Sequence, residues 1–120
     1  MSITKTNLPT CTWSGASGAG YTFYIFALHS PPRAGQVGNY IFAKRNAEGR
    51  WVPIYIGEGD LSERAGAGHH KAKCIKEKGA THFHCHLNSD VRARRAEEAD
   101  LLARYKNAYK PLGCNEGPSV

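Results

Sequence analysis

The amino-acid sequence predicts one small α/β domain in which a largely antiparallel sheet is flanked by helices. The chain has 120 residues and a mass of 13.1 kDa, which is room for a single core and no second module. Four segments are rich in aromatic and β-branched residues or alternate apolar with polar residues, as strands do. Helical segments with N-terminal caps follow the last two of these strands.

The N-terminal part predicts an arm followed by an edge strand. Residues 1–20 are rich in Ser, Thr and Gly and lack periodicity, so we expect a flexible arm. Residues 21–28 predict a strand, which we place at an edge of the sheet as an addition to three other strands. The domain would then cover residues 21–116, with a short tail at residues 117–120.

The next two strands predict a hairpin. They cover residues 39–44 and 51–56, and residues 46–49 form the turn between them. Tyr40 lies on the first arm and Tyr55 on the second. We therefore expect the two tyrosines in neighbouring strands.

Two short helices should follow the hairpin. Asp60 and Glu63 form a capping box, which predicts a helix with Arg64 in its first turn. A second helix over residues 70–78 should end at Gly79, because glycine readily adopts the left-handed conformation that closes helices.

The fourth strand, residues 81–87, alternates strictly. His82, His84 and His86 share one face, and three apolar residues share the other. We expect the apolar face to point inward and the histidines to point outward.

The longest helix begins at Ser89 or Asp90 as its cap and runs from residue 91 to about residue 107. A helical wheel places Glu98 on the apolar face of this helix. The other members of that face are Val91, Leu101, Leu102 and Tyr105.

An inward carboxylate such as Glu98 is costly unless it is paired or bound to a metal. The wheel places Glu97 on the flank of the helix, where it should be a solvated charge. The alternative to a metal ligand is an ion pair of Glu98 with Arg94 or Arg95, one turn earlier.

Composition restricts the partners and the compartment. The chain has 16 Lys and Arg against 10 Asp and Glu, a formal charge of +6 and a pI near 9.3, which suits a polyanionic partner such as nucleic acid. The longest apolar stretch, residues 21–28, is far too short to cross a bilayer, so we expect a cytoplasmic protein without a membrane partner.

The cysteines form no Cys-x-x-Cys pair, which predicts reduced thiols and neither a disulfide framework nor a zinc ribbon. They are Cys11, Cys74, Cys85 and Cys114.

An ordered set of motifs runs through these elements. The triplets Gly38-Asn39-Tyr40 and Tyr55-Ile56-Gly57 lie on the hairpin. Arg64, Glu98 and Asn115 follow, the last a few residues after a proline. In this order they resemble the GIY-YIG nuclease domain, found in the nicking subunit of bacterial nucleotide-excision repair and in some homing and restriction endonucleases. The resemblance covers residues 38–115 and implies a GIY-YIG nuclease-like version of the α/β fold.

The resemblance implies metal-dependent hydrolysis of phosphodiester bonds in DNA. In the family, one Mg²⁺ (or Mn²⁺) is held by the helix glutamate, here Glu98. The arginine, here Arg64, binds a non-bridging phosphate oxygen with its planar fork. Tyr40 corresponds to the proposed general base for water, and Tyr55 to the residue that positions water or phosphate.

The remaining site residues follow from the same resemblance. The family often has a histidine after the arginine, and here His69 or His70 could serve. Asn115 would fix the end of the chain beside Tyr40 or Glu98. Because tyrosine has an ordinary pKa of about 10, a base role for it requires nearby positive charge. Candidates for that charge are Lys44, Arg64 and Lys71.

The sequence departs from the family pattern in three ways. Asn39 is polar where the family usually has an aliphatic residue, and the connection from Tyr40 to Tyr55 is longer than usual. The letters Tyr-Ile-Phe-Ala also occur twice, at residues 24–27 and 40–43. We assign the motif to the second copy, because only that copy lies within hairpin distance of Tyr55.

Two other functions compete with a nuclease. A protein on the same scaffold could bind nucleic acid without cutting it. Alternatively His82, His84 and His86, joined by His69, His70 or a cysteine, could hold zinc in a small interaction module. One nuclease site per chain would nick one strand, so cutting both would call for a homodimer or two visits, and a separate partner could supply specificity.

Overall fold

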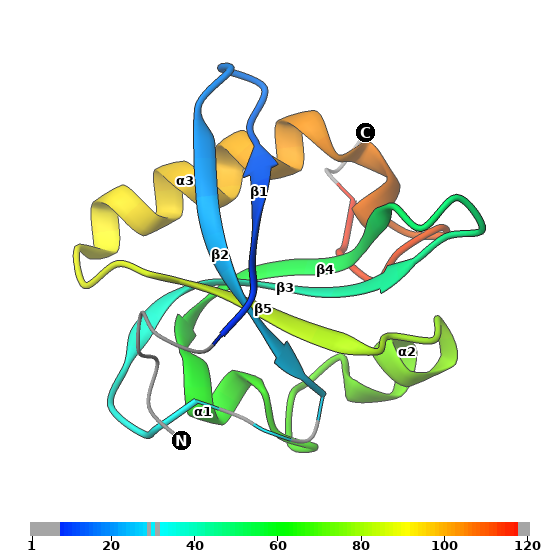
Figure 1. Cartoon of the computed structure of the whole chain (residues 1–120), viewed down its shortest axis with the longest axis horizontal. Coiled ribbons are helices and arrows are strands. Elements are labelled where there is room, and N and C mark those ends of the chain that lie inside the picture. Colours follow the sequence, from blue (N-terminus) through cyan, green and yellow to red (C-terminus); the bar gives the residue numbers. More distant parts are fainter. Residues whose placement is uncertain (1–7, 29, 31, 118–120) are drawn as a thin grey trace.

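The structure is a computed structural model and describes residues 8–28, 30 and 32–117. In this part of the chain, five strands form one curled sheet in the order β1-β2-β5-β3-β4, and every neighbouring pair is antiparallel (Figure 1). Three α-helices accompany the sheet. The predicted α/β class with an antiparallel sheet is therefore confirmed.

The four predicted strands are present. They are β2 (Gly20–Ala27), β3 (Val37–Arg45), β4 (Trp51–Asp60) and β5 (His82–Leu87). β3 and β4 form the expected hairpin, and the Asn46 N–H donates to the Arg50 carbonyl at 2.9 Å to close its turn. The register shifts between Phe42 and Ala43, where a bulge accommodates the longer connection between the two tyrosines.

β1 (Thr10–Ser14) corrects the prediction of a flexible arm over residues 1–20. It pairs with β2 and forms one edge of the sheet, so β2 is an interior strand and not the predicted edge strand. Trp13 is 3% exposed and holds β1 in the core. The sequence of β1 contains only two apolar residues within a polar stretch, so its alternation did not predict a strand. Residues 1–7 of the predicted arm and 118–120 of the predicted tail lie outside the described residues.

The helices begin close to the predicted positions. α1 (Leu61–Arg64) is capped by Asp60, which accepts hydrogen bonds from the Ser62 and Glu63 amides. α2 (Ala72–Glu77) begins two residues later than predicted and ends before Gly79, whose φ is +84°. α3 (Val91–Arg104) is capped by Asp90 and is followed by the 3₁₀ helix η1 (Lys106–Ala108).

Helices cover both faces of the sheet. Alternation along β3 sends Tyr40 and Phe42 into one apolar cluster and Ile41 and Ala43 into another. The first cluster includes residues of α1 and α2, and the second includes residues of α3 and η1. The first contains Phe26, Tyr40, Phe42, Ile54, Leu61, Ile75, Phe83, Cys85 and Cys114. The second contains Trp13, Phe23, Ile41, Ala43, Ile56, Leu101 and Ala108.

The prediction that the histidine face of β5 points outward is wrong. β5 is the central strand, and both of its faces are covered. His84 is fully buried, and Trp13 Nε1 donates to its Nδ1 at 3.0 Å. The ring of Trp51 lies edge-on to His84, with the centroids 4.5 Å apart. Leu87, expected to point inward, is 42% exposed at the end of the strand.

The prediction of four reduced thiols is also wrong. Cys74 on α2 and Cys114 form a disulfide with a Cα–Cα distance of 5.9 Å, whereas Cys11 and Cys85 are free. The two paired residues are 40 positions apart, so only the packing of α2 against the C-terminal segment brings them together. Within the described residues, no helix is long and apolar enough to cross a membrane.

Candidate functional site

The two motif tyrosines lie side by side on the β3–β4 hairpin. Their rings stack with centroids 6.0 Å apart and planes 23° apart. Tyr40 is 1% exposed, and Tyr55 is half-buried. Tyr40 pairs in register with Gly57 and Phe42 with Tyr55, so the hairpin brings together the two tyrosines as predicted.

The glycine of each triplet is required by a close approach. A Cβ atom at Gly57 would overlap the hydroxyl group and ring of Tyr40. A Cβ atom at Gly38 would overlap the backbone carbonyl of His86 on the neighbouring strand. The glycines therefore make room for Tyr40 and for the pairing of β3 with β5.

Two stacked histidines face the two tyrosines. His69 and His70 follow α1, and their rings stack with centroids 4.6 Å apart. Tyr40 Oη lies 2.8 Å from His69 Nε2, and Tyr55 Oη lies 3.4 Å from His70 Nε2. Each of the two candidate histidines therefore contacts one tyrosine.

The backbone fixes the tautomer of His69. The Lys71 N–H donates to His69 Nδ1 at 2.9 Å, so Nδ1 is an acceptor and the proton of the neutral ring is on Nε2. His69 Nε2 therefore donates to Tyr40 Oη. Burial lowers the pKa of His69 to about 4, with the nearby His70, Arg64 and Lys71 adding to the decrease, so the ring stays neutral above that pH.

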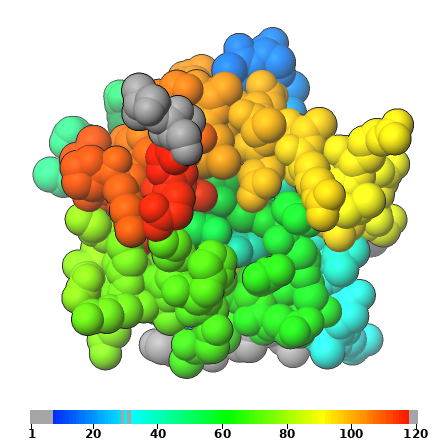
Figure 2. Space-filling model, turned by 180° about the vertical axis from the view of Figure 1, so that it is seen from behind, coloured from blue at the N-terminus to red at the C-terminus, as the bar shows by residue number. Residues whose placement is uncertain are grey.

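Arg64 is the exposed cation of the site. Its guanidinium lies over Gly59, whose φ is +141° and where an added Cβ would be 2.8 Å from Arg64 Nε. A depression of about 470 Å³ opens beside it. Figure 2 shows this side of the molecule, with the segment around α1 in green below α3. The depression is lined by Asp60, Glu63, Arg64, Gly68, His69 and His70.

Both tyrosine hydroxyls are harder to deprotonate than in water. Burial is the main cause that raises the pKa of Tyr40 above its ordinary value, and the neighbouring Tyr55 and Glu98 add to the rise. The positive charge of Arg64 opposes it. Lys44, one of the predicted sources of positive charge, instead donates to the Lys78 carbonyl at 2.8 Å and takes no part in this group.

Glu98 is half-buried on α3 and has an electrostatic effect on both tyrosines. Burial raises the pKa of Glu98 to about 6, and the carboxylate of Glu58 adds to the rise, whereas Arg95 and Arg64 oppose it. Among the described residues no basic side chain lies within 4.0 Å of the Glu98 carboxylate.

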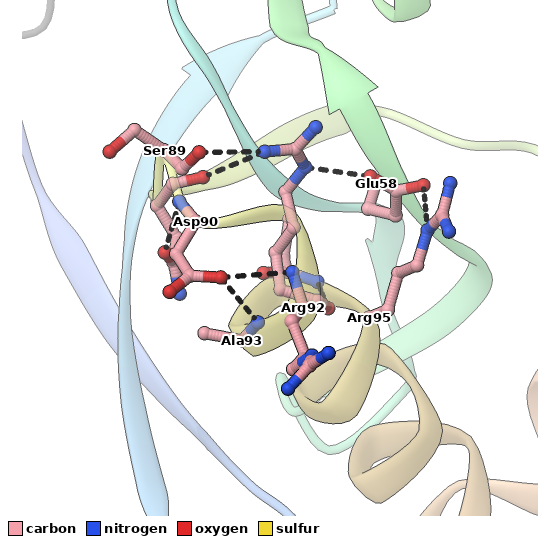
Figure 3. Close-up of polar contacts among 9 residues, drawn as sticks. Glu58, Ser89, Asp90, Arg92, Ala93 and Arg95 are labelled. Carbon is pink, nitrogen blue, oxygen red and sulfur yellow. Dashed lines mark hydrogen bonds and ion pairs between the residues drawn. The ribbon is translucent and has the colours of Figure 1, made fainter.

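Glu58, which the sequence analysis did not single out, forms the ion pairs with Arg94 and Arg95 that were considered for Glu98. Arg94 Nε lies 2.7 Å from Glu58 Oε1, and Arg95 Nε lies 3.6 Å from Oε2. Figure 3 shows the Glu58 carboxylate facing the first turns of α3, with Arg95 beside it. Its place directly after the second triplet was the one available signal. The ion-pair alternative for Glu98 is therefore wrong for both arginines, and the carboxylate stays available.

The prediction that Glu97 is a solvated charge is wrong. Glu97 is 5% exposed, and its Oε1 lies 3.4 Å from His86 Nε2. The buried stripe of α3 runs through Glu97 and Leu101, with Glu98 on its flank towards the site. Burial raises the pKa of Glu97 to about 7, and the charge of Asp100 adds to the rise.

Asn115 fastens the C-terminal segment to β4. Its Nδ2 donates to the Ile56 carbonyl and its Oδ1 accepts from the Ile56 N–H, both at 2.9 Å. Ile56 is the middle residue of the second triplet. Asn115 thus holds the end of the chain through hydrogen bonds to Ile56, the chain neighbour of Tyr55, whereas the predicted place was beside Tyr40 or Glu98.

Within the described residues, the histidines of β5 do not form a metal-binding group. Among the described residues, no group of three or more His, Cys, Asp and Glu side chains could hold a metal. His82, His84 and His86 bond instead to Thr81, Trp13 and the Thr22 carbonyl. Mg²⁺ keeps several waters and uses one or two carboxylates together with substrate phosphates, and Glu98 is a carboxylate without an ion-pair partner among the described residues.

Comparison of the chain with protein-family models, with curated proteins and with solved structures finds no match.

Proposed function

We propose that the chain is a metal-dependent endonuclease of the GIY-YIG type that hydrolyses phosphodiester bonds in DNA. One observation carries the proposal. Tyr40 and its partner His69 come from separate segments of the chain, and Arg64 and Glu98 lie close enough to affect the pKa of Tyr40. An oriented hydroxyl, a free guanidinium and a carboxylate without an ion pair are the groups that phosphodiester hydrolysis requires.

Glu98 would hold one Mg²⁺ or Mn²⁺. The ion would neutralise the charge that grows on the phosphate and on the departing oxygen. The raised pKa of Glu98 supports this role, because a carboxylate that is costly to ionise alone gains most from a bound cation.

Tyr40 acts as the base in this proposal. His69 Nε2 donates to Tyr40 Oη, so the hydrogen bond favours the deprotonated hydroxyl, and the charge of Arg64 acts in the same direction. In this step Tyr40 first releases its own proton to solvent, against the rise in its pKa that burial causes, and the tyrosinate then accepts a proton from the attacking water. His69 itself accepts no proton in this step, because its Nδ1 is already bonded to the Lys71 amide.

Arg64 binds a non-bridging phosphate oxygen, and Tyr55 with His70 positions water or phosphate at the exposed side of the site. Arg64 is exposed and its guanidinium has no bonded partner within the described part of the chain, so it is free to form the planar two-point contact that phosphate favours.

DNA is the proposed partner. The net charge of +6 supports binding to a polyanion. One site per chain nicks one strand at a time, and a homodimer or a separate specificity partner would account for cleavage of both strands.

The test is incubation of supercoiled plasmid with the protein, with and without Mg²⁺ or Mn²⁺. We expect open-circular product only when a metal is present, and none with Glu98→Ala. Glu97→Gln is the matched control, since the neighbouring carboxylate lies outside the site and should leave nicking intact. A wild-type chain that binds DNA and cuts it in no metal would favour the non-catalytic binder.

A further inference from the structure

Asn39, the polar middle residue of the first triplet, is fully buried on β3. Its Nδ2 donates a hydrogen bond of 2.7 Å to the backbone carbonyl of Arg94 in α3. Because successive side chains of a strand point to opposite faces, Tyr40 points towards His69 while Asn39 points towards α3. Two consecutive residues of β3 therefore contact the two segments that carry the site, Tyr40 at His69 and Asn39 at α3.

The Arg94 carbonyl lies one helical turn before Glu98. In an α-helix the carbonyl of residue i accepts the N–H of residue i+4, so the Arg94 carbonyl is the helical partner of the Glu98 amide. The hydrogen bond from Asn39 thus holds the turn of α3 that carries the Glu98 side chain.

Glu58 holds the same residue by its side chain. Asn39 and Glu58 are register partners on β3 and β4, and Glu58 accepts a hydrogen bond of 2.7 Å from Arg94 Nε. Arg94 Nη1 also donates to the Ser89 carbonyl at 3.2 Å. One cross-strand pair therefore fixes both the backbone and the side chain of Arg94.

The hydrogen bonding of Asn39 contributes little net free energy to folding, which favours a role in positioning α3. Its Oδ1 is buried and has no hydrogen-bond partner in the described part of the chain. An unsatisfied buried acceptor costs at least as much free energy as a typical hydrogen bond contributes. An aliphatic residue of similar volume would remove both the bond and the cost, so the fold has little need of an amide at this place.

We propose that Asn39, supported by Glu58, is a positioning residue that fixes the Glu98 carboxylate relative to Tyr40. The proposal rests on the nuclease function put forward above. Asn39 touches neither metal nor substrate, and it acts through the α3 backbone at Arg94.

The test is Asn39→Leu, compared with wild type in thermal unfolding, metal-free DNA binding and plasmid nicking at varied Mg²⁺. We expect an unchanged fold and unchanged binding, with Mg²⁺ half-saturation raised or the nicking rate lowered by about 10- to 100-fold, as for other residues that orient metal ligands. Gln36→Leu is the matched control, because Gln36 also buries an unpartnered amide oxygen but its described bonds do not reach α3. If Asn39→Leu does not fold, Asn39→Ser is used, since its side chain is too short to reach the Arg94 carbonyl.

A second measurement needs no cutting. The carboxyl carbon of Glu98 is followed by NMR against pH, with the exposed Glu116 as the internal reference. We expect the Glu98 midpoint to move in Asn39→Leu and to stay in Gln36→Leu. Unchanged Mg²⁺ half-saturation and an unchanged Glu98 titration would overturn the role of Asn39. Absence of cutting by the wild type would overturn the nuclease instead, and the titration would still decide whether Asn39 positions Glu98.

Discussion

Gly57 lies directly against the hydroxyl group of Tyr40, in the space that any Cβ atom at that position would fill. The last residue of the second triplet is thus a glycine because the last residue of the first triplet is a tyrosine. The two triplets meet in space as one unit, since Tyr40 and Gly57 are register partners on β3 and β4.

We expect Gly57→Ala to lower the nicking rate strongly while DNA binding persists. The added methyl group must displace the Tyr40 ring, which breaks its contact with His69. Overpacking of a core costs about 1–3 kcal/mol, so the variant should still fold. Nicking and thermal unfolding are measured beside Gly117→Ala, whose added Cβ meets only an ordinary contact with Tyr109. Wild-type nicking by Gly57→Ala would contradict the assigned place of the Tyr40 hydroxyl.

Tyr40→Phe removes only a hydroxyl and should slow cutting about 10²- to 10⁴-fold, the usual range for a general base. Binding should persist, because the lost group acts on water and not on the ground-state complex. Tyr24→Phe is the matched control, since Tyr24 begins the other copy of Tyr-Ile-Phe-Ala and, within the described residues, its hydroxyl forms no hydrogen bond with His69. Single-turnover cleavage rates are measured for both variants. Equal slowing by the two substitutions would show that the Tyr40 hydroxyl is not the general base.

Arg64→Ala should impair turnover by about 2–4 kcal/mol if Arg64 stabilises charge as other such donors do. DNA affinity should fall much less, because the rest of the basic surface supplies most of the salt-dependent binding. Lys76→Ala, an exposed lysine on α2, is compared in the same rate and binding assays. Loss of affinity without loss of rate would assign Arg64 to docking alone.

Glu97 gives the stability a defined pH dependence. Burial raises the pKa of Glu97 to about 7 in the fold, against about 4.3 in the unfolded chain. The folded state therefore binds the proton more tightly, and this stabilisation is complete below about pH 4.3 and lost as the pH rises through 7.

We expect Glu97→Gln, which is neutral at every pH, to unfold at a higher temperature than wild type at pH 8, with the difference vanishing towards pH 4. His86 Nδ1 donates to the Thr22 carbonyl, so Nε2 of the neutral ring, which faces Glu97, can accept an N–H of the introduced amide. Thermal unfolding between pH 4 and 8 measures the difference. A constant offset over that range would show that Glu97 keeps its ordinary pKa in the fold.

Removal of the disulfide by Cys74→Ala with Cys114→Ala should lower the free energy of unfolding. A separation of 40 residues corresponds to about 4 kcal/mol in the chain-entropy model. Denaturant titration of the double variant measures the loss, and Cys11→Ala, at a free half-buried cysteine, is the control. Equal losses in the two variants would mean that the bond itself contributes nothing.

The strands and helix starts followed from local chemistry. Alternation predicted β5, the polar turn predicted the β3–β4 hairpin, and the side chains of Asp60 and Asp90 cap the helices as their types predicted. These features depend on residues within a few positions of one another, so the sequence alone determines them. The meeting of Tyr40 with Tyr55 followed from the hairpin for the same reason.

Tertiary structure decided the features that depend on distant neighbours. The helical wheel placed Glu98 on the apolar face of α3 and Glu97 on its flank, whereas the packing of that helix against the sheet buries Glu97 against His86 and leaves Glu98 on the flank. The Cys74–Cys114 disulfide and the burial of His84 on β5 both depend on contacts between segments far apart in the sequence, which no local pattern predicts. Period and spacing determine which face a residue occupies along its own element, whereas burial on that face depends on which other element covers it.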